Sequence, residues 1–509
     1  FYYKTFMWPK VFWEKVYEPV IRASAGLGKL SMKDDPDIYD KGFLHCDILV
    51  IGAGPAGLIA ALTAAKSGAR IILADEDFRA GGRLNSESLT LSDMPGSVWA
   101  MQTLAELQAM PNVRVMTRTT VYGAYDHGVF GALERVTDHL ATSGNKPRQI
   151  LWRIYSKRSL LTAGATERPI AFSNNDRPGI MLAGAVRSYV NRYGVATGKN
   201  VAVFTNNDDG WRTACDLVTK GVNVRALIDV RDNITPPDMN GTEVITGGRI
   251  LNTTGRKALN AVTLHNGRKI SIDCLAVSGG WNPTVHLTCH QRGKPVWNED
   301  ILAFVPGGSL PQGMSVAGAA NGNFGLSSIV KSAYATTSEL LSCLGFSVKF
   351  GDLPKAEDEA QSGTAFWHVR EGRKRAWVDL QNDVTVKDIK LSYQEGFRSV
   401  EHLKRYSTLG MATDQGKTSN MAGLAILAEC SGKTIPETGT TIFRPPYTPV
   451  TIGALAGRAR GKDFRPYRLT PSHNWAQAHG ATFVETGNWL RAQWFAREGE
   501  KGWRDSVDR

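Results

Sequence analysis

Cysteine is scarce in this sequence, and no two cysteines form a CxxC motif. Six are spread over 509 residues, at Cys46, Cys215, Cys274, Cys289, Cys343 and Cys430. Thiols spaced in this way do not build a small disulfide-rich fold, and they lack the spacing of an iron–sulfur cluster. They suit structural thiols in a reducing compartment, so we expect a cytoplasmic location.

Long apolar runs are also missing. No stretch approaches the roughly 20 residues that are needed to cross a bilayer, so we expect no membrane partner. The aromatic stretch of residues 1–21 is interrupted by lysine, glutamate and proline, and it lacks the cleavage site of a signal peptide. We interpret residues 1–43 as an aromatic arm and a polar linker, in which Trp8, Phe12 and Trp13 are either interface anchors or ordinary core residues. Because the chain begins with Phe1, we expect it to be incomplete at its start.

The composition favours a globular α/β protein with several domains. The sequence has 52 glycines and 42% hydrophobic residues, and its length allows three or four domains. A formal charge of +12 would suit nucleic acid, an acidic partner or anionic cofactors. The basic clusters at 370–375 and 458–468 lie on no recognisable nucleic-acid-binding motif, so we expect no nucleic-acid partner.

A glycine-rich turn follows the first predicted strand. Residues 46–77, CDILVIGAGPAGLIAALTAAKSGARIILADED, have the order strand, turn, helix and strand. Gly52, Gly54 and Gly57 form GxGxxG, which allows a tight turn, lets the backbone approach a pyrophosphate and lets the helix pack closely on the strand. Asp75 or Glu76, at the end of the second strand, is expected to bind the adenosine ribose and to repel a 2′-phosphate. The pattern predicts NAD or FAD rather than NADP.

The far end of the same cleft bears on the choice between NAD and FAD. In FAD proteins of this architecture the late strand normally ends in Gly-Asp, and the Asp binds the ribityl chain or the phosphate near it. Here the segment GMSVAGAANGNFGL (313–326) has Ala319 after Gly318. A methyl group cannot accept those hydrogen bonds, so the sequence favours NAD modestly and does not exclude FAD.

A second unit with the same layout has lost its glycines. Residues 199–233, KNVAVFTNNDDGWRTACDLVTKGVNVRALIDVRDN, again have the order strand, turn, helix and strand. The turn at 205–210 places side chains and two carboxylates, Asp208 and Asp209, where a pyrophosphate would need bare backbone. We predict that this unit keeps its fold and has lost its nucleotide.

The predicted fold class is α/β, with two dinucleotide-binding Rossmann-like domains, the second inserted in the first, then a small mostly helical domain. Late strands in DCLAVSGGWNPTVHL (273–287) and GMSVAGAANGNFGL are predicted to return to the first domain. The expected divisions are 1–43, the arm and linker; 44–198, the first part of the NAD-binding domain; 199–270, the inserted domain; 271–345, the second part of the NAD-binding domain; 346–375, a bridge; 376–460, the helical domain with a Pro-rich segment; and 461–509, the start of a further domain.

Three other features are candidate sites. His286, Cys289 and His290 stand at helical spacing, but no fourth metal ligand is evident, so we predict no metal. His402 is more typical of a structural helix residue than of a catalytic base. In the Pro-rich segment 440–450, Arg444 is a candidate ligand for a flavin phosphate at a subunit boundary, although a loop that packs on another domain explains it equally well.

These residues together resemble a known family. The paired strand–turn–helix units, SGGWNPTVHL, AGAANG, and above all the long segments at 378–429 and 439–458, resemble the alpha subunits of heterotetrameric sarcosine oxidases over nearly the whole chain. Residues 469–495 resemble the start of the folate-binding domain of those subunits, which is akin to aminomethyltransferases. That domain would need several hundred more residues, so we also expect the chain to be truncated at its end.

The resemblance implies an oxidoreductase complex with beta, gamma and delta subunits. Such a complex oxidises sarcosine with oxygen and tetrahydrofolate to glycine, hydrogen peroxide and 5,10-methylene-tetrahydrofolate. The resemblance places a covalently attached FMN at the alpha–beta boundary, FAD within the beta subunit, tetrahydrofolate beyond residue 509, and a non-redox NAD in the alpha subunit. Because the resemblance places the amine oxidation in the beta subunit, we assign no catalytic residue in this chain.

The resemblance also implies a set of cofactor contacts. They fall, by matched position, at Gly52, Gly54, Ala56, Gly57, Asp75, Glu76, Arg83, Val121, Ala319, Phe324 and Leu326, with Asp77 and Gly318 beside them. Asp77 stands where a basic residue is more typical, and Arg83 stands where a small polar residue is. The alternatives are a reductase that uses FAD and NAD, a subunit of an amine dehydrogenase, and a basic non-catalytic scaffold.

Overall fold

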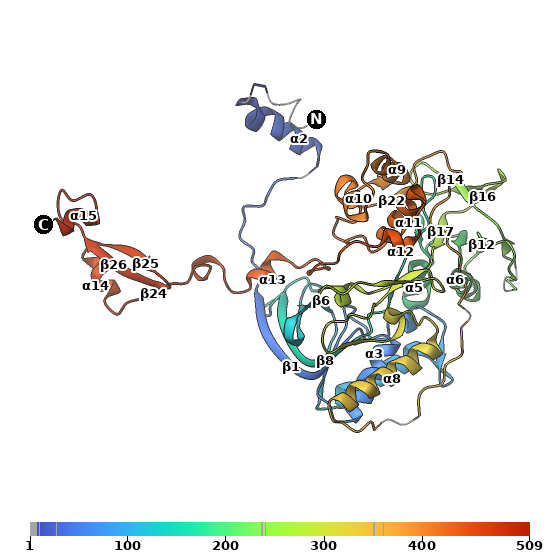
Figure 1. The fold of residues 1–509 in the computed structure, drawn as a ribbon, viewed down its shortest axis with the longest axis horizontal. Coiled ribbons are helices and arrows are strands. Elements are labelled where there is room, and N and C mark those ends of the chain that lie inside the picture. The colour runs from blue at the N-terminus through green and yellow to red at the C-terminus, as the bar shows by residue number, and fades with distance from the viewer. Residues whose placement is uncertain are drawn as a thin grey trace. The chain divides into compact units, whose positions relative to one another are not determined.

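The computed structural model describes residues 8–9, 11–26, 28–235, 238–239, 241–349, 352–359 and 361–508 (Figure 1). The chain divides into two compact units between Ile38 and Tyr39. The first unit contains η1, Trp13–Tyr17, and α2, Glu18–Ser24. Trp8 and Phe12 are exposed within it, and the Phe12 ring lies edge-on to Tyr17 with 6.3 Å between the ring centroids.

The first sheet of the second unit has seven strands. Six follow the order β5-β2-β1-β8-β7-β6, and β21 pairs with β8. Pairing is parallel among β5, β2, β1, β8 and β21, whereas β7 is antiparallel to β8 and to β6. The strands are β1 Tyr39–Ile51, β2 Ile71–Ala74, β5 Val113–Met116, β6 Thr119–Tyr125, β7 Val129–Arg135, β8 Gln149–Leu161 and β21 Met314–Val316.

Strand β1 is longer than the sequence indicates. We expected a linker up to residue 43 and a strand from about residue 46, but the strand begins at Tyr39. The extra residues lie beside β8, with Tyr39 opposite Gln149 and His45 opposite Tyr155. Exposed and less exposed side chains alternate in this part of β1, so its partner strand, and not an apolar run, makes it a strand.

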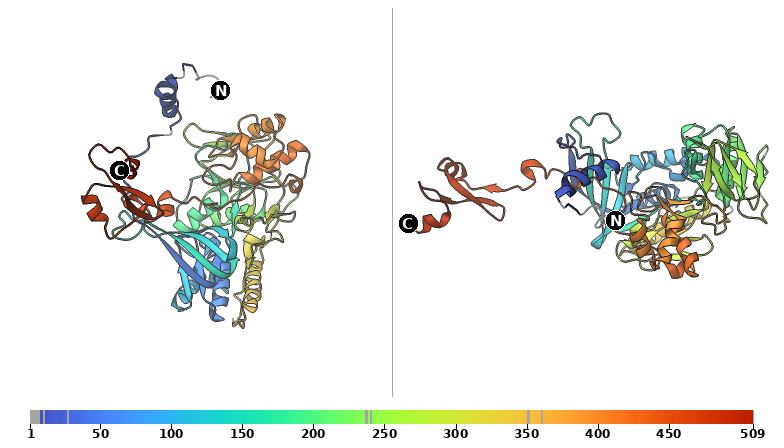
Figure 2. Two further views of the ribbon diagram at one scale, coloured as in Figure 1. Left: turned by 60° about the vertical axis from the view of Figure 1, so that its left-hand side comes forward. Right: turned by 90° about the horizontal axis from the view of Figure 1, so that it is seen from above.

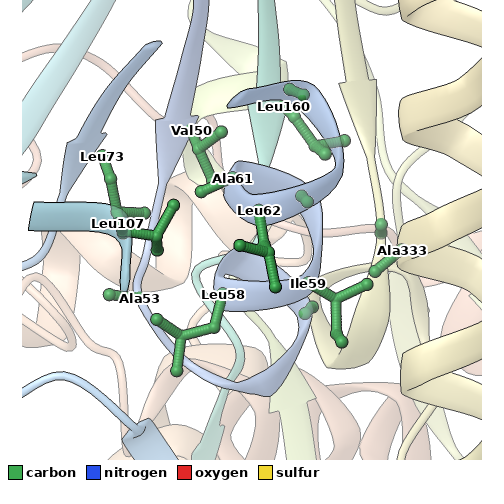
Figure 3. Packing of buried hydrophobic residues seen from close by; sticks show 14 of the residues in the cluster. Val50, Ala53, Leu58, Ile59, Ala61, Leu62, Leu73, Leu107, Leu160 and Ala333 are labelled. Atoms are coloured by element: carbon green, nitrogen blue, oxygen red, sulfur yellow. The ribbon is translucent and has the colours of Figure 1, made fainter. Parts of the chain in front are cut away.

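Two helices cover one face of this sheet. Helix α3, Pro55–Lys66, is rich in alanine and is buried from Pro55 to Ala65. Small side chains let α8, Leu326–Cys343, lie alongside it, and Figure 3 shows Ile59 of α3 close to Ala333 of α8. Helix α4, Gly96–Ala109, adds Leu107 to the same core. The packing fixes the start of α3 against the carboxyl ends of β1 and β8.

The second sheet has five parallel strands in the order β10-β17-β11-β12-β13. They are β10 Ile180–Leu182, β11 Val201–Thr205, β12 Val224–Asp229, β13 Glu243–Ile245 and β17 Cys274–Ser278. Helices α5, Ala183–Tyr193, and α6, Asp208–Thr219, pack on it. This layout is Rossmann-like, and the predicted α/β fold class is confirmed.

The predicted placement of the strand at Cys274–Ser278, β17, in the first domain is wrong, whereas Leu287 packs in the core of the first sheet. Strand β17 lies between β10 and β11 in the second sheet, so the inserted domain extends on both sides of the predicted 199–270. A fully buried apolar strand such as CLAVS can pack in the interior of either sheet, so its local sequence does not show which strands it pairs with. Of the two late strands we expected, only β21 returns to the first sheet.

Short elements connect the two sheets. Strand β9, Ala165–Glu167, pairs with β18, Trp281–Pro283, where the chain enters and then leaves the inserted domain. A three-stranded antiparallel sheet extends the insertion, with β14 Ile250–Thr254, β15 Ala261–Leu264 and β16 Lys269–Ser271. Other short elements are η2 Gly82–Asn85, β3 Thr90–Leu91, β4 Met94–Pro95, η3 Asp126–Gly128, α7 His286–Cys289, β19 Val296–Asn298, β20 Ala303–Val305 and η4 Gly318–Asn321.

Helices follow the bridge and form one group, drawn in orange in Figure 2. They are α9 Val386–Gln394, α10 Val400–Ser407, α11 Asn420–Ser431 and α12 Ile435–Thr438, preceded by β22 Trp377–Asp379 and β23 Val384–Thr385. Thr385 and Asp388 form a capping box at the start of α9. Gly432 ends α11 in the left-handed conformation, as predicted for a C-cap.

The remaining elements follow the Pro-rich segment. They are α13 Ile452–Ala456, η5 Gly461–Asp463, β24 Arg468–Leu469, α14 His473–Ala478, β25 Ala481–Thr486, β26 Trp489–Phe495 and α15 Trp503–Val507. Strands β24, β26 and β25 form a small sheet. No helix among the described residues combines the length and the apolar character needed to span a bilayer.

We predict that Gly57→Ala destabilises the first sheet and its helices. A Cβ atom on Gly57 would lie 1.8 Å from the Gly52 carbonyl oxygen, which is backbone and cannot rotate away. We expect the free energy of unfolding to fall by about 3 kcal/mol, as measured by chemical denaturation. Gly308→Ala is the control, because no atom lies within 4 Å of the added methyl. Equal stability of the two variants would contradict the close approach of α3 to the turn.

Candidate functional site

The turn between β1 and α3, residues 52–57, has three glycines. At two of them a side chain would clash with the backbone, and at the third there is space for one. Gly52 has a φ of 103°, and a Cβ atom there would lie 2.5 Å from the Thr162 carbonyl oxygen. Gly57 is closed by Gly52 itself. A Cβ atom on Gly54 would have only the Cα of Gly82 near it, at 4.0 Å. Gly52 and Gly57 therefore serve the fold, whereas Gly54 leaves space for a ligand to approach the backbone.

The start of α3 lies at this open position. Gly54 is its N-cap and has no side chain to cap the helix, and Pro55 follows at the first helical position. The amide groups of the first helical turn, which include those of Ala56 and Gly57, are left without intrahelical acceptors. These free amides form the positive end of the helix dipole, which favours an anion such as a pyrophosphate.

The Asp75 carboxylate stabilises the turn through hydrogen bonds to the backbone. It accepts hydrogen bonds from the backbone N–H groups of Ala53 and Asp77, the latter at 2.7 Å. Burial nevertheless raises the pKa of Asp75 to about 6. Glu76 is exposed, so of the two acids that the sequence proposes for the ribose, Glu76 is the one whose carboxylate faces solvent.

Asp77 takes part in an ion pair with the inserted domain. Its two carboxylate oxygens accept from the Arg192 guanidinium at 2.6 and 2.8 Å. Burial opposes the charge, but this pair and its hydrogen bonds hold the pKa of Asp77 below its usual value. Asp77 is therefore used for contact between domains.

The expected far end of the dinucleotide site lies at the start of α8. Gly318, with a φ of 70°, is so close to α3 that a Cβ atom there would lie 2.8 Å from the Ala56 methyl, and Ala319 follows in η4. Arg83 donates to the Phe324 carbonyl oxygen. The Leu326 N–H donates to the carboxylate of Glu359 at 2.7 Å.

The structure brings together most of the predicted contact residues. Gly318 lies against Ala56 at the start of α3. Arg83 donates to Phe324, and Leu326 begins α8 beside them. Val121 is buried in β6 in the core that contains Ile72 and Ala74 of β2. Arg444 belongs to a different cavity. Sequence reasoning missed Gly82 and Glu359, and nothing distinguishes Glu359 from its neighbours in the acidic run AEDEA.

The second turn, residues 205–210, is filled by the protein's own groups. Asn207 caps α6 by accepting from the N–H groups of Asp209 at 3.0 Å and Gly210 at 3.3 Å. The Asp208 N–H donates to the Ser362 carbonyl oxygen at 3.0 Å, and the Ser362 N–H returns a bond to the Asp208 carboxylate at 2.8 Å. The amides that would face a pyrophosphate are already used.

Buried acids surround the second turn. Asp209 forms ion pairs with Arg187 at 3.3 Å and Arg212 at 3.1 Å. Nearby, Glu167 accepts from the Gly184 N–H at 2.7 Å, and burial together with the Asp209 charge raises the pKa of Glu167 to about 8. Carboxylates at this helix start disfavour a bound phosphate.

A cationic cavity of about 200 Å³ lies between α10, α11 and the Pro-rich segment. Its lining includes Lys404, Arg405, Arg444 and Tyr447. Arg405 pairs with Glu401 at 3.4 Å, and the Glu401 carboxylate also accepts from the Ile442 N–H at 2.8 Å. Arg444 is exposed at the cavity. The cavity offers clustered positive charge that suits an anionic group.

A smaller cavity of about 90 Å³ shares the Tyr447 side chain. The ring of His286 stacks on Tyr447 with 4.4 Å between centroids, and burial lowers the pKa of His286 far below its usual value. Burial also lowers the pKa of His290 to about 4, and the Cys289 thiol donates to the Val285 carbonyl oxygen. These side chains are packed as core residues.

Metal-ligand geometry is not found in the described part of the chain, where no three His, Cys, Asp or Glu side chains gather around a common point. His402, the other histidine considered, is exposed on α10.

We predict that Glu167 makes stability depend on pH. Its pKa rises from about 4.5 to about 8 on folding, so between these values the folded protein holds a proton that the unfolded chain does not. Stability from this group should be present below pH 4.5 and should fall, by up to about 1.4 kcal/mol per pH unit, as the pH rises towards 8. The measurement is urea denaturation from pH 5 to 8.

Glu167→Gln should remove this contribution, because an amide keeps the shape and the hydrogen bond without titrating. Glu299→Gln, at an exposed loop position, is the control and should keep the wild-type slope. The same pH slope in Glu167→Gln and wild type would show that Glu167 is ionised in the folded protein.

Comparison with known proteins places the chain in a family. Residues 373–458 match the sarcosine oxidase A3 domain, and residues 47–137 match the FAD dependent oxidoreductase family. The sarcosine oxidase alpha subunit of Rhizobium meliloti (strain 1021) is 47% identical over 100% of this chain and 52% of its own length. That of Corynebacterium sp. (strain P-1) is 40% identical over 93% of this chain and 52% of its own length.

More distant similarity extends to other oxidoreductases. An opine oxidase subunit from Agrobacterium tumefaciens (strain Ach5) is 24% identical over 81% of this chain and 91% of its own length. The crystal structure of L-proline dehydrogenase from P. horikoshii has the same fold, with a TM-score of 0.68, 19% identity and coverage of 84% of this chain and 82% of that one. The chain spans about half the length of the sarcosine oxidase subunits it matches. On this similarity, the chain belongs to the family of sarcosine oxidase alpha subunits.

Proposed function

We propose that this chain is the part of a heterotetrameric sarcosine oxidase that holds NAD as a structural, non-redox cofactor. The observation that carries the proposal is the contrast between the two turns. The first leaves Gly54 open at an uncapped helix start, whereas the second is filled by Asn207, Asp208 and Ser362. One dinucleotide site is therefore available in a fold built for two.

The residues of the first cleft fit NAD. The open backbone at Gly54 and the start of α3 would hold the pyrophosphate, and the exposed carboxylate of Glu76 would bind the adenosine ribose. Asp75 would keep the turn in shape through its bonds to Ala53 and Asp77. At the far end, the Ala319 methyl offers no acceptor for a ribityl chain, which supports NAD over FAD.

The cationic cavity at Arg444 fits a flavin phosphate at the boundary with a beta subunit. Together, Arg444, Lys404 and Arg405 would hold the phosphate of FMN, and the flavin when bound would supply electron transfer to oxygen. The exposed position of Arg444 supports contact with a group that is shared between subunits. The A3 domain match covers this segment and supports the same assignment.

The proposed reaction belongs to the complex with beta, gamma and delta subunits. It oxidises sarcosine with oxygen and tetrahydrofolate to glycine, hydrogen peroxide and 5,10-methylene-tetrahydrofolate, with folate bound beyond residue 509 and FAD held by the beta subunit. The names and identities of the related alpha subunits support this proposal. The unpaired cysteines of the described residues support a cytoplasmic location.

The first test is to identify the nucleotide that the purified protein releases on denaturation. We expect one NAD and no flavin from this chain alone, and we expect flavin to appear when the partner subunits are present. Chromatography and absorbance distinguish the two. One FAD per isolated chain would instead favour a reductase and would overturn the argument from Ala319.

We predict that Arg444→Ala weakens flavin retention by the assembled complex without removing NAD. Loss of one phosphate-binding cation should lower retention of FMN before its covalent attachment about tenfold or more, as measured by flavin content per complex. Lys387→Ala, at an exposed position on α9, is the matched control. Wild-type flavin content in Arg444→Ala would remove Arg444 from the site.

A further inference from the structure

The bridge segment, defined here as residues 352–359 and 361–369, is anchored on the second turn. Besides the paired bonds between Ser362 and Asp208, the Thr364 N–H donates to the Asn206 carbonyl oxygen at 3.0 Å. The Asn206 side-chain amide donates back to the Thr364 carbonyl oxygen at 2.7 Å. Arg231 holds the Asp208 carboxylate from the other side at 2.8 Å. The surface that lost its nucleotide now fixes the position of this segment.

The anchored segment brings Glu359 to the first cleft. The Glu359 side chain is 7% exposed and accepts from the Leu326 N–H, the first amide of α8, at 2.7 Å. It also pairs with Arg83 at 2.9 Å, and Arg83 donates in turn to the Phe324 carbonyl oxygen. Leu326, Phe324 and Arg83 are three of the proposed dinucleotide contacts, and the first two follow Ala319 at the expected far end of the site.

The Glu359 carboxylate occupies the start of α8, so this helix end no longer favours a further negative charge from a ligand. A free helix start favours negative charge, but here the protein supplies that charge itself. Although burial opposes the charge, Glu87 and Glu359 raise the pKa of Arg83 above its usual value, so this guanidinium keeps its positive charge. The buried cluster holds three guanidinium groups and four carboxylates: Arg83, Arg187 and Arg212 with Glu87, Asp209, Asp216 and Glu359. It carries a surplus of negative charge.

The redox groups of the two dinucleotides differ in charge at this end. An oxidised nicotinamide ring is positive and becomes neutral when it accepts a hydride. A reduced isoalloxazine ring carries negative charge on its pyrimidine side. A nearby buried carboxylate stabilises the first, gains nothing from reduced nicotinamide and repels the reduced flavin.

We propose that Glu359 is a specificity-determining residue of the first cleft, which selects oxidised nicotinamide dinucleotide over its reduced form and over reduced flavin. The inference rests on the proposed binding of NAD in this cleft. It deepens that function, because a nicotinamide held in its oxidised form resists hydride uptake. The non-redox role of the cofactor then follows from one carboxylate that is held by the bridge segment.

The test is competitive binding to the full-length chain assembled with its partner subunits. The complex is incubated with mixtures of NAD⁺ and NADH, freed of unbound nucleotide, and denatured so that chromatography gives the ratio retained. We expect the wild type to prefer NAD⁺ by at least about tenfold and Glu359→Gln to lose about tenfold of this preference. Asp358→Asn, with the same charge change on an exposed neighbour, should retain the wild-type ratio.

Two results would overturn the proposal. One is a wild-type complex that retains NADH as well as NAD⁺, which decides the matter even if Glu359→Gln does not fold. The other is a folded Glu359→Gln complex whose ratio equals that of the wild type. Retention of neither nucleotide by the wild type would be a different failure, because it would remove the proposed NAD site itself.

Discussion

The buried guanidinium of Arg187 is the constraint on which the arrangement of the two Rossmann-like parts depends. It lies on α5 of the inserted domain, where it pairs with Asp216 at 2.5 Å and Asp209 at 3.3 Å, and it reaches Glu87 of the first domain at 3.7 Å. Burial opposes its charge, yet these carboxylates raise the pKa of Arg187 above the usual value. Removal of one partner from such a cluster costs about 3–5 kcal/mol, because the rest is left buried and unpaired. The cluster therefore keeps the bridge segment, both turns and α8 in one fixed relation.

The two strand-to-helix turns have the same layout but differ in whether their backbone amides are free for a ligand. At the first, Gly54 exposes backbone to a ligand while Gly52 and Gly57 only let the chain close on itself. At the second, Asn207 and Asp208 consume the same backbone groups. The filled second turn also anchors the bridge segment, which brings Glu359 to the start of α8.

Some features of the candidate site follow from local sequence, and others do not. Gly52, Gly54 and Gly57 could be recognised because their spacing follows from backbone sterics that are local to one turn. Gly432 could be recognised for the same reason, as a left-handed residue at a helix end. The sequence proposes Asp75 or Glu76 for the ribose and does not show that the Asp75 carboxylate also accepts from the backbone of Ala53 and Asp77. The order of residues does not show which way such a side chain turns.

By itself the sequence determined the two strand–turn–helix–strand units, the glycine positions and the family, since each depends on local conformation or on long matching segments. Only the tertiary structure decided that β17 joins the second sheet and that β1 begins at Tyr39, because strand partners are chosen by packing between distant residues. It also decided that Glu359 meets Leu326 and Arg83, which lie 33 and 276 residues away along the chain. Long-range hydrogen bonds and buried charges of this kind have no local pattern, and they appear only when the chain has folded.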